Sequence, residues 1–422
     1  MLAGALALGL LAAGCGRGDD GTASDPGTTP SSSAALAPAA APGFDPAAGT
    51  IKVGSLTALS GPLTSLADPL NAGTRAFFQA VNAAGGVGGR YRVELVEEDT
   101  RFDNPTTVQK YQKIKDQVTM FGQILGTGPI SAVLPQIKAD NIMALPASLD
   151  ERWIAEPNLL PYGAPYQVQF LNGANYYANE LQGRQNKICS LAIEGPYGDA
   201  GLRGVEAAAA AESLALATVA RFRSGETDFT AQVTQLKDSG CQAVFLTALP
   251  ANTGVVLGTA LKLGFRPQWL AQSPAWEPAM VDFPELAPVL DNEFLLLSEA
   301  AQWGDDSVPG MARLLADAAR FAPDQKPDLY FIAGYVQGWA VERLLAKAVE
   351  LGDLSRAGMF DAQRRLGTVS FGGLYGDYTY GPPEQRNPSR TTTVYAVDRT
   401  VAGSLRALKK NVSSPAAASF KF

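Results

Sequence analysis

Residues 188–193, ICSLAI, and residues 241–247, CQAVFLT, are two short apolar runs that are typical of buried strands. Sequence patterns around them predict helices at 167–181, 200–212 and 253–263, a further helix capped by Asp228, and strands at 217–222 and 268–271. Strands that alternate with helices in this way require a parallel sheet with helices on both faces. This part of the chain is therefore expected to be an α/β lobe.

The same alternation precedes this lobe. Strands are expected at 51–56, 91–96, 119–125 and 142–145, with helices opening at Asp68-Pro69, at Asn104-Pro105 and after Gly126-Thr127-Gly128. The fold class is thus α/β, with two doubly wound parallel-sheet lobes. Helices at 307–321 and 329–351 are expected to return to the first lobe, and a strand at 392–397 to the second. The expected boundaries are 50–165 plus 298–390 for lobe 1, 166–297 plus 391–412 for lobe 2, and 413–422 for a flexible tail.

The N-terminal region has a different composition. An apolar run from Leu6 to Gly14 is too short to span a bilayer and ends at Cys15. Its last residues, LAAGC, resemble the lipobox of bacterial lipoproteins. We therefore expect residues 1–15 to be a signal peptide with a lipid-attachment site at Cys15, and residues 16–49, which are small and polar, to be a disordered tether. The alternative is an apolar helix with a buried free cysteine.

Composition excludes several classes of function. The net charge of -7 and the pI near 4.9 argue against a nucleic-acid partner. Because the chain has no histidine, Ser-His-Asp and Cys-His nucleophile pairs and the common zinc sites are absent. There is no GxxxxGK[ST] phosphate loop, and 86–89 precedes a strand rather than a helix. We expect no metal and no cofactor, while catalysis by paired carboxylates stays open.

Cys189 and Cys241 each stand at the start of a predicted strand. If the two strands are neighbours in one parallel sheet, a disulfide between them is feasible at the cell surface. The alternative is a pair of unbonded core cysteines, and we favour the disulfide.

A ligand of such a sheet lies beyond the carboxyl ends of its strands. The loops there include Ser60 after the first strand, Gly126 and Thr127 after the third, and Ala147 and Ser148 after the fourth. In the second lobe the corresponding loops include Tyr197, Leu249 and Ser273. Free amides where a helix begins after Gly126 favour a carboxylate. The sequence therefore predicts a binding cleft between the lobes.

From Ile51 to about Asp398 the chain resembles the type I periplasmic binding proteins of the leucine/isoleucine/valine-binding branch, which supply ABC importers. The stretches that carry the resemblance are LSGP at 59–62, VNAAGGVGGR at 81–90, EEDT at 97–100, PYGDAG at 196–201 and DFTAQV at 228–233. The resemblance implies two lobes joined by a three-segment hinge, with a small solute bound in the cleft.

The resemblance also implies roles for single residues. Gly126 and Thr127 would bind a ligand carboxylate, Ala147 and Ser148 would contact the ligand, and Tyr197 would close over the side chain of the ligand. Ser273 falls where amino-acid-binding members usually place an acid for the ligand ammonium group. Either Glu277 replaces that acid from a rearranged loop or the ligand is not an α-amino acid. Leu249 makes its wall of the cleft more apolar, and Trp276 either stacks on the ligand or packs between the lobes.

These observations favour a lipid-anchored, extracytoplasmic solute receptor that is monomeric and not an enzyme. It would capture a small carboxylate, amide or amino-acid-like ligand with an apolar or aromatic body and deliver it to an ABC permease. A ligand sensor of the same fold, with a signalling partner, is the first alternative. A carboxylate-based hydrolase is the second.

Overall fold

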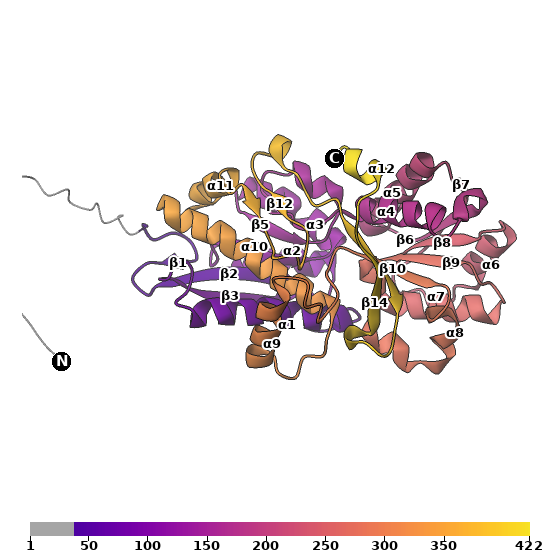
Figure 1. Cartoon of the computed structure of the whole chain (residues 1–422). Helices are drawn as coiled ribbons and strands as arrows, with labels where there is room; N and C mark the ends of the chain where they lie inside the picture. Colours follow the sequence, from indigo (N-terminus) through magenta and orange to yellow (C-terminus); the bar gives the residue numbers. More distant parts are fainter. Residues whose placement is uncertain (1–37) are drawn as a thin grey trace, which may run out of the picture. The chain divides into compact units, whose positions relative to one another are not determined.

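The structure is a computed structural model, and it describes residues 38–422. Five strands form the first sheet (Figure 1), in which β2, β3, β4 and β5 are parallel and β1 pairs antiparallel with the start of β2. The strands are β1 (Phe44–Asp45), β2 (Thr50–Thr57), β3 (Arg92–Asp99), β4 (Met120–Leu125) and β5 (Ala144–Ala147). The connecting helices are α1 (Thr64–Ala83), α2 (Asn104–Ile114) and α3 (Thr127–Ala139).

Seven strands form the second sheet, in the order β14-β13-β10-β9-β8-β6-β7. They are β6 (Lys187–Ile193), β7 (Ala215–Phe222), β8 (Ala243–Thr247), β9 (Gln268–Gln272), β10 (Phe294–Ser298), β13 (Thr392–Val397) and β14 (Leu405–Val412). Strands β6 to β10 are parallel, as the alternation predicted, and β13 and β14 add an antiparallel edge. The helices between them are α4 (Tyr166–Asn179), α5 (Pro196–Glu212), α6 (Thr230–Asp238), α7 (Pro250–Lys262) and α8 (Ala287–Leu290).

The chain passes three times between the two sheets. It leaves the first sheet after β5, returns after β10 through α9 (Met311–Phe321), α10 (Leu329–Leu351) and α11 (Arg356–Arg364), and leaves again before β13. A small hairpin of β11 (Thr368–Val369) and β12 (Tyr378–Thr379) precedes the last passage. Three adjacent connections let two sheets move as bodies about one hinge.

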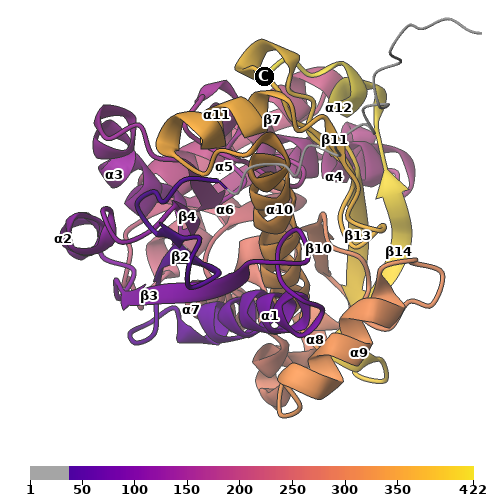
Figure 2. The ribbon, with the colours of Figure 1, turned by 90° about the vertical axis from the view of Figure 1, so that its left-hand side faces the viewer.

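Helix α10 packs directly on α1 (Figure 2). The two backbones meet at Gly73 and Gly334, where an added Cβ would lie 2.1 Å from the Phe331 carbonyl oxygen and 1.8 Å from the Leu70 carbonyl oxygen, respectively. Thr74 donates its hydroxyl to the Gly334 carbonyl at 3.0 Å. Because any side chain at these two glycines would push the helices apart, the contact fixes α10, whose first turn reaches the site described below.

Several helix starts differ from the prediction. Pro69 lies inside α1, which begins at Thr64, because packing of buried Leu66 and Leu70 outweighs the hydrogen bond that proline removes. Helix α2 is capped by Asp103 rather than Asn104, since the Asp103 carboxylate accepts the Thr106 amide at 2.8 Å. Helices α5 and α7 begin four and three residues early, at Pro196 and Pro250, and α9 begins four residues late, at Met311.

Both predicted terminal segments require correction within the described residues. Residues 38–49 are not tether, because β1 pairs with β2 and Phe44 is buried beside Tyr91. Residues 413–422 are not a flexible tail either. They form α12 (Pro415–Ser419), which contacts α4, and the Arg390 guanidinium donates to the Ala417 carbonyl at 2.9 Å. The remaining tether, residues 16–37, and the predicted signal peptide with Cys15 lie outside the described residues.

Cys189 at β6 and Cys241 just before β8 are joined by a disulfide, with their Cα atoms 5.8 Å apart. The two strands are direct neighbours in the second sheet. Among the described residues no helix is long and apolar enough to cross a membrane.

Candidate functional site

A cavity lies where the carboxyl ends of strands from both sheets meet. It contains about 700 Å³ of space between atoms, including the part open to solvent. The lining residues are Leu63, Leu66, Leu70, Phe102, Leu125, Gly126, Thr127, Gly128, Ala147, Ser148, Leu149, Tyr162, Tyr166, Tyr197, Leu249, Ser273, Pro274, Glu299, Leu329, Tyr330, Ala333, Gln337 and Tyr375. Most of these side chains are aliphatic or aromatic, so the cavity suits a ligand with an apolar body.

One end of the cavity is the start of α3. Gly126 adopts a φ of 101°, and an added Cβ would lie 2.3 Å from the Phe102 ring. The helix therefore offers the amides of Thr127 and Gly128, while Pro129 has none to offer. These amides and the positive end of the helix dipole favour an anionic group.

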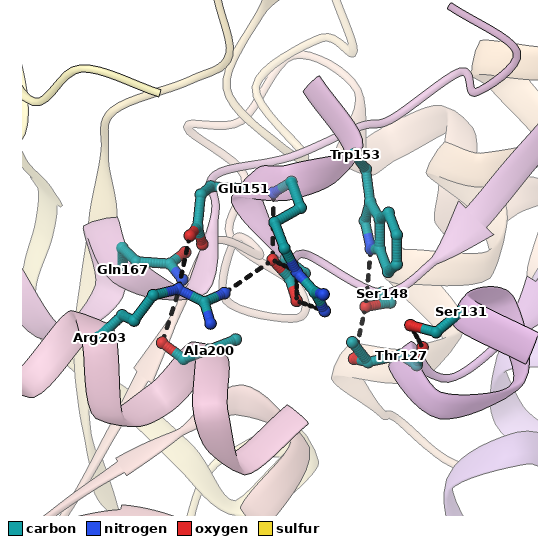
Figure 3. A network of polar contacts seen from close by, with 10 residues as sticks. Thr127, Ser131, Ser148, Glu151, Trp153, Gln167, Ala200 and Arg203 are labelled. Carbon is teal, nitrogen blue, oxygen red and sulfur yellow. Dashed lines mark hydrogen bonds and ion pairs between the residues drawn. The ribbon is translucent and has the colours of Figure 1, made fainter. Parts of the chain in front are cut away.

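Two hydroxyls stand beside those amides (Figure 3). The hydroxyl oxygens of Thr127 and Ser148 are 2.7 Å apart, and the Trp153 ring nitrogen donates to Ser148 at 3.1 Å. Because the indole already donates to Ser148, that hydroxyl remains able to donate its own proton, either to Thr127 or to a ligand. This arrangement brings together four of the predicted residues, Gly126, Thr127, Ala147 and Ser148.

Tyr197 reaches the cavity from the first turn of α5. Its ring centroid lies 5.0 Å from that of Tyr166, and its buried hydroxyl has no hydrogen-bond partner in the part of the chain that the structure describes. Leu249, at the start of α7, forms part of the same wall. The structure thus places Tyr197 and Leu249 in the cavity, where the sequence had located them.

In the described part of the chain, Glu299 is the one carboxyl group that lines the cavity. Gln169 donates to its Oε2 at 2.6 Å, Ser273 to the same oxygen at 3.3 Å, and Tyr375 to Oε1 at 2.8 Å. Burial raises the pKa of this carboxyl to about 7, although the three donors oppose the shift. No salt bridge between described residues includes Glu299, so three neutral groups hold it.

Tyr330 and Gln337 bring α10 into the site. The Tyr330 hydroxyl lies 2.7 Å from the Ser273 carbonyl and 2.9 Å from the Trp276 carbonyl, so it links α10 to the loop after β9. Gln337 donates to the Tyr162 hydroxyl at 2.6 Å, and its carbonyl oxygen is buried without a partner among the described residues. Tyr330 thus joins the walls of the cavity contributed by the two lobes, whereas the contact between Gln337 and Tyr162 lies within the first lobe.

Two predicted ligand residues lie outside the cavity. Ser60 donates its hydroxyl to Asp99 at 2.6 Å and orders the loop after β2. Trp276 is fully buried, with its ring 5.9 Å from that of Phe294. Glu277, considered as a replacement acid, is also outside the lining.

The sequence reasoning missed Glu299 because it did not predict β10. The signal was present, since the apolar run FLLLS at 294–298 follows the turn-forming pair Asp291-Asn292. Glu299 is the first residue beyond that run. A strand assigned there would have placed the residue at a carboxyl end, beside Ser273.

The lining limits the chemistry of the site. Among the described residues it includes one carboxyl group and no lysine or arginine. Catalysis by two carboxylates, left open by the sequence, has no second carboxylate among the lining residues. Within residues 38–422 no group of three or more metal-ligating side chains comes together. The arrangement is suited to holding a small molecule between an amide-rich end and an acidic end.

Ion pairs connect the two sides beside the cavity. Arg203 of α5 donates to Glu151 at 2.8 Å and to Asp150 at 3.2 Å, and both acids follow β5 in the first lobe (Figure 3). Arg152 also pairs with Asp150, at 2.6 Å. Since Asp150 is only two residues from Ser148, the contact between lobes adjoins the site.

One family of known proteins matches most of the chain. The sequence profile of the family described as "Periplasmic binding protein" matches residues 50–402. No curated protein matches the chain.

Three solved structures illustrate the similarity of fold. A fatty acid ABC transporter substrate-binding protein from Thermomonospora curvata is 24% identical, with a TM-score of 0.83 over 91% of this chain and 97% of that one. A branched chain amino acid ABC transporter from Thermus thermophilus with bound valine is 18% identical, with a TM-score of 0.73 over 87% and 97%. A possible leucine/isoleucine/valine-binding protein from Rhodopirellula baltica is 20% identical, with a TM-score of 0.74 over 85% and 96%.

Proposed function

Because the chain belongs to the periplasmic binding protein family, we propose that it captures a small ligand with an apolar body between its two lobes and delivers it to an ABC importer. The observation that carries the proposal is the cavity itself, which lies between the lobes, is mostly apolar and has a polar group at each end. Proteins similar in fold are named for fatty acids and for branched chain amino acids. An apolar body is common to both ligand classes.

The proposal includes a carboxylate, amide or amino-acid-like ligand at the start of α3. Two free amides and the hydroxyls of Thr127 and Ser148 support an anionic or carbonyl group there. The receptor is proposed to act as a monomer outside the cytoplasm, anchored through lipid on Cys15. A Cys15→Ser variant tests the anchor, since it should move from the membrane fraction to the soluble fraction.

The decisive experiment identifies the ligand and then disturbs the cavity. Purified protein is denatured, the released small molecules are identified by mass spectrometry, and the affinity of the refolded protein for them is measured by calorimetry. Tyr197→Ala should weaken binding by about tenfold or more, because it removes an aromatic wall of the cavity.

Ser60→Ala is the matched control. Ser60 lies in a loop at a strand end, as Tyr197 does, but outside the cavity. The affinity of the Ser60→Ala variant for the ligand should stay within about twofold of the wild type. If Tyr197→Ala also leaves the affinity unchanged, the ligand binds elsewhere and the proposed site is wrong. Recovery of a chemically altered ligand after incubation would instead indicate an enzyme.

A further inference from the structure

Glu299 is a carboxyl group in a largely apolar cavity, and none of the residues 38–422 that line this cavity is basic. Its three hydrogen-bond donors, from Gln169, Ser273 and Tyr375, are neutral groups. An ionised carboxylate in such a place is costly unless a cation joins it. The lining supplies no cation, and the chain contains no histidine.

Five tyrosine rings line the same cavity: Tyr162, Tyr166, Tyr197, Tyr330 and Tyr375. Two pairs of them are in contact, with ring centroids 5.8 Å apart for Tyr162 and Tyr375 and 5.0 Å apart for Tyr166 and Tyr197. Tyrosine faces attract organic cations, and more strongly where water is excluded. Tyr375 combines both properties, since its ring lines the cavity and its hydroxyl donates to Glu299.

Unused acceptors add to this pattern. An ionised carboxylate accepts about four hydrogen bonds, and Glu299 receives three. The carbonyl oxygen of Gln337, another lining residue, has no partner among the described residues. An ammonium group carries donors for acceptors of this kind, whereas a second carboxylate beside Glu299 would add a like charge.

Building on the proposed function, we propose that the ligand carries an ammonium group attached to its apolar body, and that Glu299 binds this group within the tyrosine-lined part of the cavity. Glu299 lies on the segment after β10. The loop after β9, where an acid was expected from the resemblance, has Ser273 instead. Glu299, at the end of the neighbouring strand, thereby supplies the acid that is missing at position 273. Ser273 itself donates a hydrogen bond to this acid.

Three probes with one body and different head groups test the inference: 3-phenylpropylamine, 3-phenylpropan-1-ol and 3-phenylpropanoate. Calorimetry at pH 8 should show that the ammonium probe binds about tenfold or more tightly than the alcohol. In Glu299→Gln the ammonium probe and the alcohol should bind with equal affinity. Glu299→Asp, which withdraws the carboxylate by one methylene, should give an intermediate preference and is a second test if the first variant folds poorly.

Glu342→Gln is the control, because Glu342 is a part-buried acid on α10 outside the cavity. It should keep the wild-type preference. The inference is overturned if the ammonium probe binds no more tightly than the alcohol, if Glu299→Gln keeps the ammonium preference, or if no ammonium probe binds. If the ammonium probe fails while the propanoate binds and loses affinity in Tyr197→Ala, the solute-binding function stands and only the ammonium group is rejected.

Discussion

At the scale of single residues, Glu299 is a group whose ionisation opposes the ligand-free fold. Its pKa is raised to about 7 by burial, and its neighbours cannot offset this by titrating. The titratable groups around it are Tyr162, Tyr166, Tyr197, Tyr330, Tyr375 and Tyr395. Burial raises their pKa values too, so these tyrosines stay neutral from pH 5 to 8. The charge state of the cavity therefore depends on one carboxyl.

This gives a pH dependence of stability with a definite sign. The folded state holds the proton on Glu299 up to about pH 7, whereas the unfolded chain releases it near pH 4.5, so stability falls as the pH rises between these values. The full effect is on the order of 3 kcal/mol. Glu299→Gln should therefore gain thermal stability relative to the wild type at pH 8 but not at pH 4.5.

Melting curves of the ligand-free proteins from pH 4.5 to 8 provide the measurement. Glu350→Gln is the control because that side chain is exposed, and its difference from the wild type should vary much less with pH. A Glu299→Gln difference that is constant over the whole range would show that the carboxyl is ionised throughout.

Gly126 gives a second prediction at this scale. Gly126→Ala places a Cβ at a φ of 101° and 2.3 Å from the Phe102 ring, whereas Gly195→Ala meets a similar φ of 97° with no atom within 4 Å. Both variants should lose about 1–2 kcal/mol from backbone strain. Gly126→Ala should lose more and also weaken ligand binding, as measured by denaturant unfolding and calorimetry. Equal losses would mean that Phe102 moves aside freely.

At the scale of elements, the disulfide connects the start of β6 to the start of β8 across 52 residues of sequence. Closing a loop of this length stabilises the fold by about 4 kcal/mol if the effect is entropic. The double variant Cys189→Ala/Cys241→Ala should therefore unfold at a lower denaturant concentration than the wild type, and reductant should produce the same shift in the wild type only. Cys15→Ser is the control and should unfold as the wild type does.

The sequence predicted an element correctly where neighbouring residues stabilise it, and misplaced an element that is stabilised by contacts with remote parts of the chain. Strands such as β6 and β8 were found because their apolar runs are bounded by polar turns. The start of α1 was misplaced because Asp68-Pro69 imitates a cap, while the true start depends on packing against α10, which is remote in sequence.

The same distinction between local and remote contacts holds for the residues of the site. Gly126, Thr127, Ser148 and Tyr197 stand at the ends of predicted strands and could be located, although their ligand contacts remain predictions. Tyr330 and Gln337 enter from α10, whose position no local pattern reveals. The tyrosines around Glu299 come from separate segments, and only the folded chain brings them together.

At the scale of the whole molecule, Arg203 connects the two lobes through Glu151 and Asp150. Arg203→Gln should favour separation of the lobes and weaken ligand binding about fivefold, corresponding to about 1 kcal/mol for a part-exposed pair. High salt should weaken wild-type binding in the same direction.

Calorimetry and small-angle X-ray scattering of the ligand-free protein measure these two effects. Arg221→Gln is the control, because Arg221 pairs with Asp199 within the second lobe, at 2.6 Å. It should change neither affinity nor radius of gyration. An Arg203→Gln protein that behaves identically would show that the ion pairs add nothing to closure.

The pairing of β1 with β2 has a mechanical consequence. Phe44 is buried and the strand is hydrogen-bonded to the first sheet, so a pull on the chain before residue 38 is borne by that lobe alone. The second lobe is connected to it only through the hinge passages and the contacts between lobes. In a receptor attached to a membrane by its N-terminal end, the first lobe would thus stay in place while the second lobe moves about the hinge. A force at the attachment point would act on the first lobe only, so it would not oppose the separation of the lobes that releases the ligand.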